Sequence, residues 1–178
     1  MVYLLCSKKQ TQVNCLYIEA GYLCNSTCYF CACFKLNEEE KMNIEYIEKK
    51  PLALEYNNLT KKVEWGTREE SIVKTALNNS IYCICVYAEK ELIGFGRIIG
   101  DKTIFLYIQD IMVAPVYQKQ KIGSTIIKKI LDKVNEYKKI NPEIRVYLGA
   151  DKGKEKFYEK FGFITREENG LGSGMILS

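Results

Sequence analysis

Residues 110–124 have the sequence Asp-Ile-Met-Val-Ala-Pro-Val-Tyr-Gln-Lys-Gln-Lys-Ile-Gly-Ser. An apolar run ends at Pro115, which cannot continue an interior strand because it has no backbone N–H. A basic loop follows and contains Gly123. From Ser124 onward the apolar residues recur at three-to-four spacing, with lysines between them, as in an amphipathic helix. The stretch predicts a strand, a turn and a long helix.

Three runs before this loop, at 81–88, 92–99 and 104–113, are rich in β-branched and aromatic residues. The linkers between them, 89–91 and 100–102, are short enough for hairpins, which predicts an antiparallel meander. The third run is apolar on both faces, as a central strand requires, with Gln109 and Asp110 as exceptions. Its predicted faces are Ile104, Leu106, Ile108 and Met112 on one side, and Phe105, Tyr107, Ile111 and Val113 on the other.

The flanking segments complete an α/β pattern. A first strand is expected within 43–48, and a capping box from Thr67 to Glu70 predicts a helix over about 67–79. After the long helix we expect a strand at 144–148, a short helix over 153–161 that ends at Gly162, and closing strands at 163–164 and 175–177. The predicted fold is a mixed, mostly antiparallel central sheet flanked by helices, in the order β-α-β-β-β-α-β-α-β-β.

Composition narrows the classes of function. The chain has 178 residues, a net charge of +4 and no histidine, which excludes Ser-His-Asp and Cys-His triads. The charge is too small and too mixed to indicate a nucleic-acid partner, and no apolar run is long enough to span a membrane. Because no export signal is apparent, we expect a cytoplasmic protein with a small-molecule partner.

The cysteines divide the chain into a Cys-rich segment, 1–41, and the remainder, 42–178. The spacing of Cys24, Cys28 and Cys31 resembles the cluster-binding loop of radical S-adenosylmethionine enzymes over about eight residues, but the barrel of such enzymes has no counterpart here. The alternative is a translated leader, because 37–41 could be encoded by a purine-rich ribosome-binding site ahead of Met42. Cys83 and Cys85 alternate with apolar residues and are predicted to be reduced core thiols.

The loop in 110–124 resembles the phosphate-binding loop of the GNAT superfamily of acyl-CoA N-acyltransferases, whose pattern is Gln/Arg-x-x-Gly-x-Gly/Ala. Gln118 and Gly123 match this pattern, whereas Lys121 replaces its first glycine. A helix N-terminus with unpaired amides binds anions, so the resemblance implies that the loop holds the acetyl-CoA pyrophosphate. The implied cofactor-binding residues are Ile111, Met112 and Val113 along pantetheine, and Gln118, Lys119, Gln120, Lys121, Ile122, Gly123 and Ser124 around the phosphates.

A second patch, Phe-Tyr-Glu-Lys-Phe-Gly-Phe at 157–163, resembles the family's helix and turn beside the cofactor thiol. The resemblance implies that the Tyr158 phenol protonates the departing thiolate and that the Ile111 amide polarises the thioester carbonyl. Asp151 and Lys154 stand where the family usually has Asn and Ala.

The general base and the acceptor site are less well defined by the sequence. Asp110 could accept the proton of the amine, or it could pair structurally with Arg97. Glu64 and Glu69, beside Trp65, lie in the segment expected to cover the acceptor and are rival bases. Gly94 and Gly96 on one strand face would leave room for a ligand or mark a bulge.

The resemblance implies an N-acetyltransferase that moves acetyl from acetyl-CoA to a primary amine by direct attack, without a metal. Two other hypotheses remain: a non-catalytic acyl-CoA sensor with the same pocket, and an Fe–S or metal-binding regulator that uses the N-terminal cysteines. The sequence identifies neither the small-molecule or peptide amine nor the oligomeric state, and a homodimer is left open.

Overall fold

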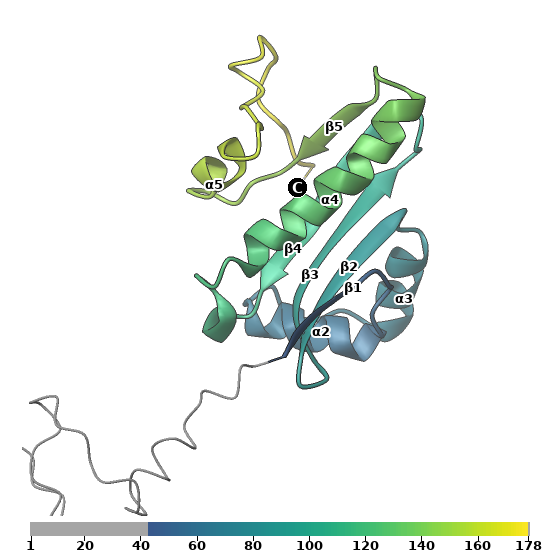
Figure 1. The fold of residues 1–178 in the computed structure, drawn as a ribbon, viewed down its shortest axis with the longest axis vertical. Helices are drawn as coiled ribbons and strands as arrows, with labels where there is room; N and C mark the ends of the chain where they lie inside the picture. Colours follow the sequence, from purple (N-terminus) through teal and green to yellow (C-terminus); the bar gives the residue numbers. More distant parts are fainter. Residues whose placement is uncertain (1–42, 178) are drawn as a thin grey trace, which may run out of the picture. The chain divides into compact units, whose positions relative to one another are not determined.

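A computed structural model describes residues 43–177, which contain a five-stranded sheet (Figure 1). The spatial order of the strands follows the chain: β1 (Ile44–Ile47), β2 (Tyr82–Ala88), β3 (Glu91–Gly100), β4 (Phe105–Val113) and β5 (Arg145–Leu148). Strands β1 to β4 are antiparallel to their neighbours, and β5 pairs in parallel with β4. The predicted meander and the mixed, mostly antiparallel sheet are confirmed.

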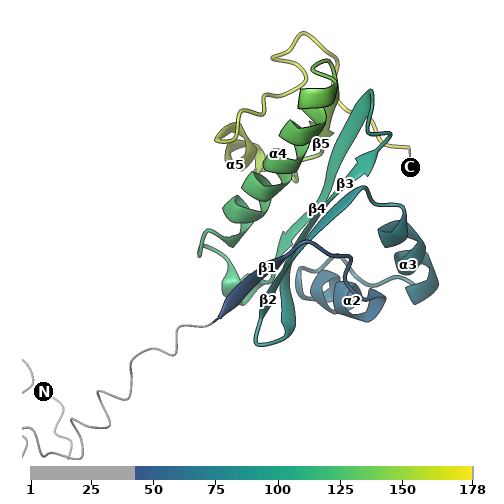
Figure 2. The same cartoon turned by 45° about the vertical axis from the view of Figure 1, so that its right-hand side comes forward.

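Helices cover both faces of the sheet (Figure 2). One face carries α2 (Ala53–Lys62) and α3 (Glu70–Asn78), whose Leu59 and Val73 pack with Phe95 of β3. The other face carries the long α4 (Ile122–Ile140), whose Ile126 and Ile130 are fully buried. The one-turn helix η1 (Pro115–Tyr117) precedes α4, and the short α5 (Glu155–Glu159) lies on the same side of the sheet as α4.

The segment before β2 differs from the sequence prediction. The structure contains α2, which we did not predict after Pro51, and α3 begins at Glu70 rather than at 67. The buried Asn57 explains the late start, because its side chain donates to the Arg68 carbonyl at 2.7 Å and accepts from the Arg68 N–H at 3.1 Å. This clamp holds the connection extended, so Thr67 does not cap α3, and the residue before the helix is Glu69.

The prediction of two closing strands, at 163–164 and 175–177, is also wrong. No strand follows α5 in the part of the chain that the structure describes, up to residue 177. Met175, Ile176 and Leu177 are 98%, 92% and 99% exposed. These apolar runs are short and are preceded by several glycines, which favour irregular backbone over a strand. Without a paired neighbour, two or three β-forming residues do not make a strand.

A β-bulge interrupts β4 at Asp110. Arg97 pairs with Gln109 and Phe95 with Met112, so Asp110 and Ile111 together oppose the single residue Gly96. Asp110 has a φ of 56°, in the left-handed region. The extra residue reverses the side-chain alternation. The predicted faces are therefore right up to Ile108 and wrong after it: Ile111 and Val113 pack toward α4, and Met112 packs toward α2.

Gly96 is filled by protein, not by a ligand. A Cβ there would lie 2.6 Å from Ile111 Cδ1, 2.8 Å from Ile126 Cγ2 and 2.9 Å from Ile130 Cδ1. We expect Gly96→Ala to lower the free energy of unfolding by about 1–3 kcal/mol through overpacking, measured by urea denaturation. Gly123→Ala is the control, because its Cβ would meet nothing closer than 3.6 Å and should not destabilise the fold. Equal stability of the two variants would contradict this packing.

Candidate active site

The loop before α4 presents unpaired backbone donors. Lys119 and Lys121 adopt left-handed conformations, with φ of 63° and 64°. Lys121 is the residue before α4, and no side chain caps the helix. The N–H groups of Ile122, Gly123 and Ser124 in the first turn therefore have no intrahelical acceptor. Together with the helix dipole and two lysines, this arrangement suits an anion.

Lys121 stands where the family pattern has its first glycine. It has the left-handed conformation that glycine adopts freely, and a residue with a Cβ adopts it at a cost of about 1–2 kcal/mol. Lys121 therefore has a backbone conformation that a glycine at this position could also adopt. Gln118 supports the loop, because its Nε2 donates to the Val113 carbonyl at 3.1 Å. Ser124 is the third residue of α4 and is not its cap.

The end of β4 has one unpaired edge. Pairing between β4 and β5 stops at Ile108 and Leu148, and no strand within residues 43–177 continues along that edge. The Ala114 N–H donates to the Ile93 carbonyl on β3 at 2.8 Å. Since successive strand residues direct their N–H groups to opposite edges, those of Val113 and Ile111 point to the unpaired edge. The Ile111 amide is available to an external acceptor.

Helix α5 lies next to the end of β4 and the start of α4. A Cβ on Gly123 would lie 3.6 Å from Phe157 Cζ and 3.7 Å from Val113 Cγ2, so the end of β4, the start of α4 and α5 converge. Tyr158 follows Phe157, and the two rings pack edge to face at 5.0 Å. Burial, with a smaller contribution from the Asp151 carboxylate, raises the pKa of the Tyr158 phenol. Tyr158 is therefore a protonated donor at neutral pH.

Asp110 is paired. Its side chain is 8% exposed, and Oδ2 accepts from Arg97 Nε at 2.7 Å and from the Tyr56 hydroxyl at 2.8 Å. Structural pairing with Arg97, one of the two alternatives from the sequence, is thus present. These two donors hold the carboxylate between α2 and β3. Tyr56 lies in the core.

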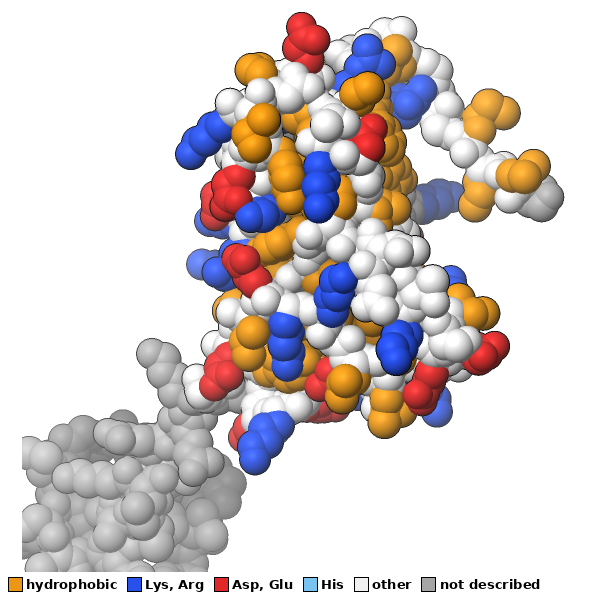
Figure 3. Space-filling view, turned by 90° about the vertical axis from the view of Figure 1, so that its right-hand side faces the viewer, with side chains coloured by type: hydrophobic (Ala, Val, Ile, Leu, Met, Phe, Trp, Pro, Cys, Tyr) orange, Lys and Arg blue, Asp and Glu red, His pale blue; other side chains and the backbone are white. Residues whose placement is uncertain are grey.

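The predicted acceptor-site residues lie together on the connection between α2 and α3. Trp65 is 43% exposed, and Glu64 has a left-handed φ of 64°. Glu69 accepts a hydrogen bond from the Ser71 hydroxyl. No hydrogen bond among residues 43–177 links Glu64, Trp65 or Glu69 to Asp110 or Tyr158. On the face shown in Figure 3, positive and negative side chains are interspersed.

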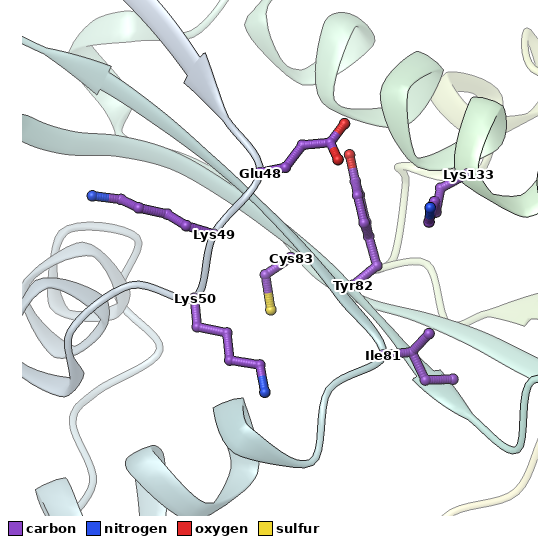
Figure 4. A pocket seen from close by; sticks show the side chains of 7 residues that line it. All are labelled: Glu48, Lys49, Lys50, Ile81, Tyr82, Cys83 and Lys133. Carbon is purple, nitrogen blue, oxygen red and sulfur yellow. The ribbon is translucent and has the colours of Figure 1, made fainter.

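A cavity of about 220 Å³ lies where β2 continues past the end of β1 (Figure 4). Each of the three lysines that line it contacts another residue. Lys50 donates to the Asn78 carbonyl at 2.7 Å and Lys133 pairs with Glu136, while Lys49 lies over the Tyr87 ring. Lys133 is far along α4, roughly 16 Å from Ile122 at 1.5 Å per residue. This cavity is separate from the loop before α4. Its lining residues are Glu48, Lys49, Lys50, Ile81, Tyr82, Cys83 and Lys133.

The two cysteines of β2 are free and buried, as predicted. Burial raises the pKa of the Cys83 thiol, and it raises that of Cys85 to about 12. The cysteines of 1–41, and the metal-site hypothesis based on them, lie outside the described residues. Within 43–177 no three metal-ligating side chains cluster. In the same range, no helix has the length and apolar character needed to cross a bilayer.

Comparison with known proteins identifies the family. Residues 57–177 match the model of the acetyltransferase (GNAT) domain. An uncharacterised N-acetyltransferase of Prochlorococcus marinus, described as ycf52-like, is 32% identical over 144 residues, which cover 79% of this chain and 77% of the relative.

Two solved structures have the same fold. A probable acetyltransferase from meticillin-resistant Staphylococcus aureus is 28% identical, with a TM-score of 0.68 over 76% of this chain and 99% of its own. The aminoglycoside N-acetyltransferase AAC(6')-Iy, solved with CoA, is 11% identical, with a TM-score of 0.50 over 79% of this chain and 95% of its own. The family model and the cyanobacterial relative establish that this chain is an acetyltransferase of the GNAT family.

Proposed function

We propose that the protein transfers the acetyl group of acetyl-CoA to a primary amine by direct attack. The observation that carries this proposal is the convergence of the uncapped start of α4, the unpaired edge of β4 at Ile111, and α5 with Tyr158. An anion site, a carbonyl-polarising donor and a proton donor are the groups that this reaction needs.

We assign binding of the cofactor pyrophosphate mainly to backbone amides, and to lysine side chains in addition. The amides from Gln118 to Ser124 would hold the pyrophosphate, with the Lys119 and Lys121 ammonium groups adding attraction. Pantetheine would lie along the unpaired edge of β4 and form strand-like hydrogen bonds with the backbone of Ile111, Met112 and Val113. No metal takes part in the proposed reaction.

The chemical steps follow from this placement. The neutral amine attacks the thioester carbon, a C–N bond forms, and the Ile111 N–H stabilises the oxyanion. Collapse of the tetrahedral intermediate breaks the C–S bond, and the Tyr158 hydroxyl protonates the departing thiolate. The proton that the amine loses passes to water or to a carboxylate. The candidate carboxylates are Asp110, which is paired with Arg97 and Tyr56, and Glu64 and Glu69 beside Trp65.

The rival function is an acyl-CoA sensor with the same pocket, which the occupied Asp110 carboxylate keeps open. Calorimetry with acetyl-CoA, followed by incubation with a panel of small and peptide amines and a free-thiol readout, separates the two functions. We expect binding and thiol release with at least one amine. Binding without release would favour the sensor, and absence of binding would contradict both.

We propose that residues 42–178 form the acetyltransferase domain, because the family match lies within them. Removal of residues 1–41 is expected to leave the melting temperature and the acetyl-CoA affinity unchanged, since every described strand and helix lies beyond that point. Thermal melting and calorimetry of the shortened and full chains test this. An insoluble or non-binding shortened protein would contradict the domain boundary.

The buried free thiols fit a reducing compartment, and we propose the cytoplasm as the place of action.

A further inference from the structure

A buried hydrogen-bond network surrounds the β4 bulge. Asp110 Oδ2 accepts from the Tyr56 hydroxyl of α2 at 2.8 Å and from Arg97 Nε of β3 at 2.7 Å. Arg97 Nη1 in turn donates to the Ala76 carbonyl of α3 at 3.1 Å and to the Ser80 hydroxyl at 3.2 Å. Tyr56, Ser80 and Asp110 are each less than 9% exposed. The network thus joins α2, α3, β3 and β4.

The bulge has an uncommon backbone conformation. Asp110 has a φ of 56°, in the left-handed region that few residues with a Cβ adopt, aspartate and asparagine more readily than most. Such a conformation is held by its surroundings. Those surroundings include the two donors on the Asp110 carboxylate. The network therefore stabilises a backbone conformation that an isolated strand would avoid.

The bulge determines which edge of β4 the Ile111 N–H faces. Before it, the Phe105 carbonyl accepts from Asp101 on the β3 side at 3.1 Å, whereas the Ile104 carbonyl accepts from Arg145 on the β5 side at 2.9 Å. Ile111 is an even number of residues from Phe105, so in a regular strand its N–H would face β3. The extra residue turns the Ile111 N–H to the unpaired edge instead.

We infer that Tyr56 and Arg97 are positioning residues that act through Asp110 to hold the Ile111 amide against the thioester carbonyl. This inference rests on the proposed function. Tyr56 suits the role because burial, with the adjacent Asp110 carboxylate, raises the pKa of its phenol and keeps it a donor. Its ring also packs edge to face on Phe95 at 5.5 Å, so its position does not depend on the hydroxyl.

The test uses acetyl-CoA labelled with ¹³C at the carbonyl, bound to the full chain and observed by NMR. A hydrogen bond to a carbonyl oxygen moves the carbonyl carbon resonance downfield. We expect this movement in the wild type, and we expect Tyr56→Phe to lose roughly half of it or more as the amide loses its fixed direction. The affinity for CoA, which has no acetyl carbonyl, is expected to change less than about twofold.

Tyr87→Phe is the matched control. Tyr87 is on the same face, is 6% exposed like Tyr56, and donates to a carboxylate, Glu55 Oε2, at 3.1 Å. It should retain the wild-type resonance. Asp110→Asn is a second variant, which loses the charge but tolerates the left-handed conformation, and it should also reduce the displacement.

The outcomes separate this inference from the proposed function. A wild-type displacement that Tyr56→Phe and Asp110→Asn both retain would overturn the positioning role and leave the proposed function intact. A wild type that does not bind acetyl-CoA would overturn both. Equal losses in Tyr56→Phe and Tyr87→Phe would show a general loosening of the core and would also overturn the positioning role.

Discussion

Tyr158→Phe is expected to lower kcat at least about tenfold while acetyl-CoA affinity changes little, because general acid catalysis contributes about a hundredfold to ten-thousandfold. The substitution removes only the hydroxyl. The edge-to-face contacts of the ring with Phe157, at 5.0 Å, and with Phe163, at 6.2 Å, can persist. Single-turnover kinetics are the appropriate measurement, because slow product release could hide the change in steady state.

The pH profile provides a second readout for Tyr158. Burial raises the pKa of its phenol above the ordinary value of 10.0, so the donor stays protonated throughout the neutral range. Any loss of rate from its ionisation is therefore expected only above pH 10. A Tyr158→Phe rate equal to that of the wild type in single turnover would make Tyr158 a packing residue and leave the thiolate to be protonated by water.

Gly123→Asp is expected to weaken acetyl-CoA binding at least about tenfold, because it places a negative charge where unpaired amides would meet the pyrophosphate. The fold should tolerate the change, since a Cβ here would be 3.6 Å from Phe157 and 3.7 Å from Val113, which are ordinary contacts. Calorimetry with acetyl-CoA measures the loss.

Gly123→Asn is the control for this prediction, because it has nearly the same size without the charge. Gly123→Asn is expected to bind acetyl-CoA more tightly than Gly123→Asp does. The difference in affinity measures the part of the loss that is due to charge. If the folded Asp variant binds as the wild type does, the loop before α4 is not part of the cofactor site.

The parts of the fold that depend on local pattern could be predicted from the sequence. The three strands of the meander are β-branched and aromatic runs, and α4 has a clear amphipathic period. The start of α3 could not be predicted, because the capping box at Thr67 is overridden by Asn57, ten positions earlier in the chain. A helix terminus set by a tertiary contact leaves no local signal.

The bulge at Asp110 shows a second limit. An alternation analysis assumes that each residue advances the strand equally, so one extra residue inverts every face beyond it. Gln109 and Asp110, two polar residues in an apolar strand, were the available sign of irregularity. Tyr56, 54 positions from Asp110, had no such sign, because its partner is determined only by the packing of α2 on the sheet.

Within the candidate site, the matching motifs marked the loop before α4 and the segment of Tyr158, and the structure brings these segments together at Gly123 and Phe157. Lys121, at the position of the family's first glycine, has a left-handed conformation of the kind that favours glycine. Whether Asp110 pairs with Arg97 could not be predicted with certainty from the sequence, because the ion pair joins neighbouring strands next to a bulge.

Acetyl transfer from acetyl-CoA to an amine is best measured by following both products at once. Purified full-length protein is incubated with acetyl-CoA and the amine panel, free thiol is quantified, and the amines are analysed by mass spectrometry. We expect at least one primary amine to gain an acetyl group in an amount equal to the thiol released, and we expect Tyr158→Phe to slow both. Tight acetyl-CoA binding with no acetylated amine across the panel would contradict this expectation.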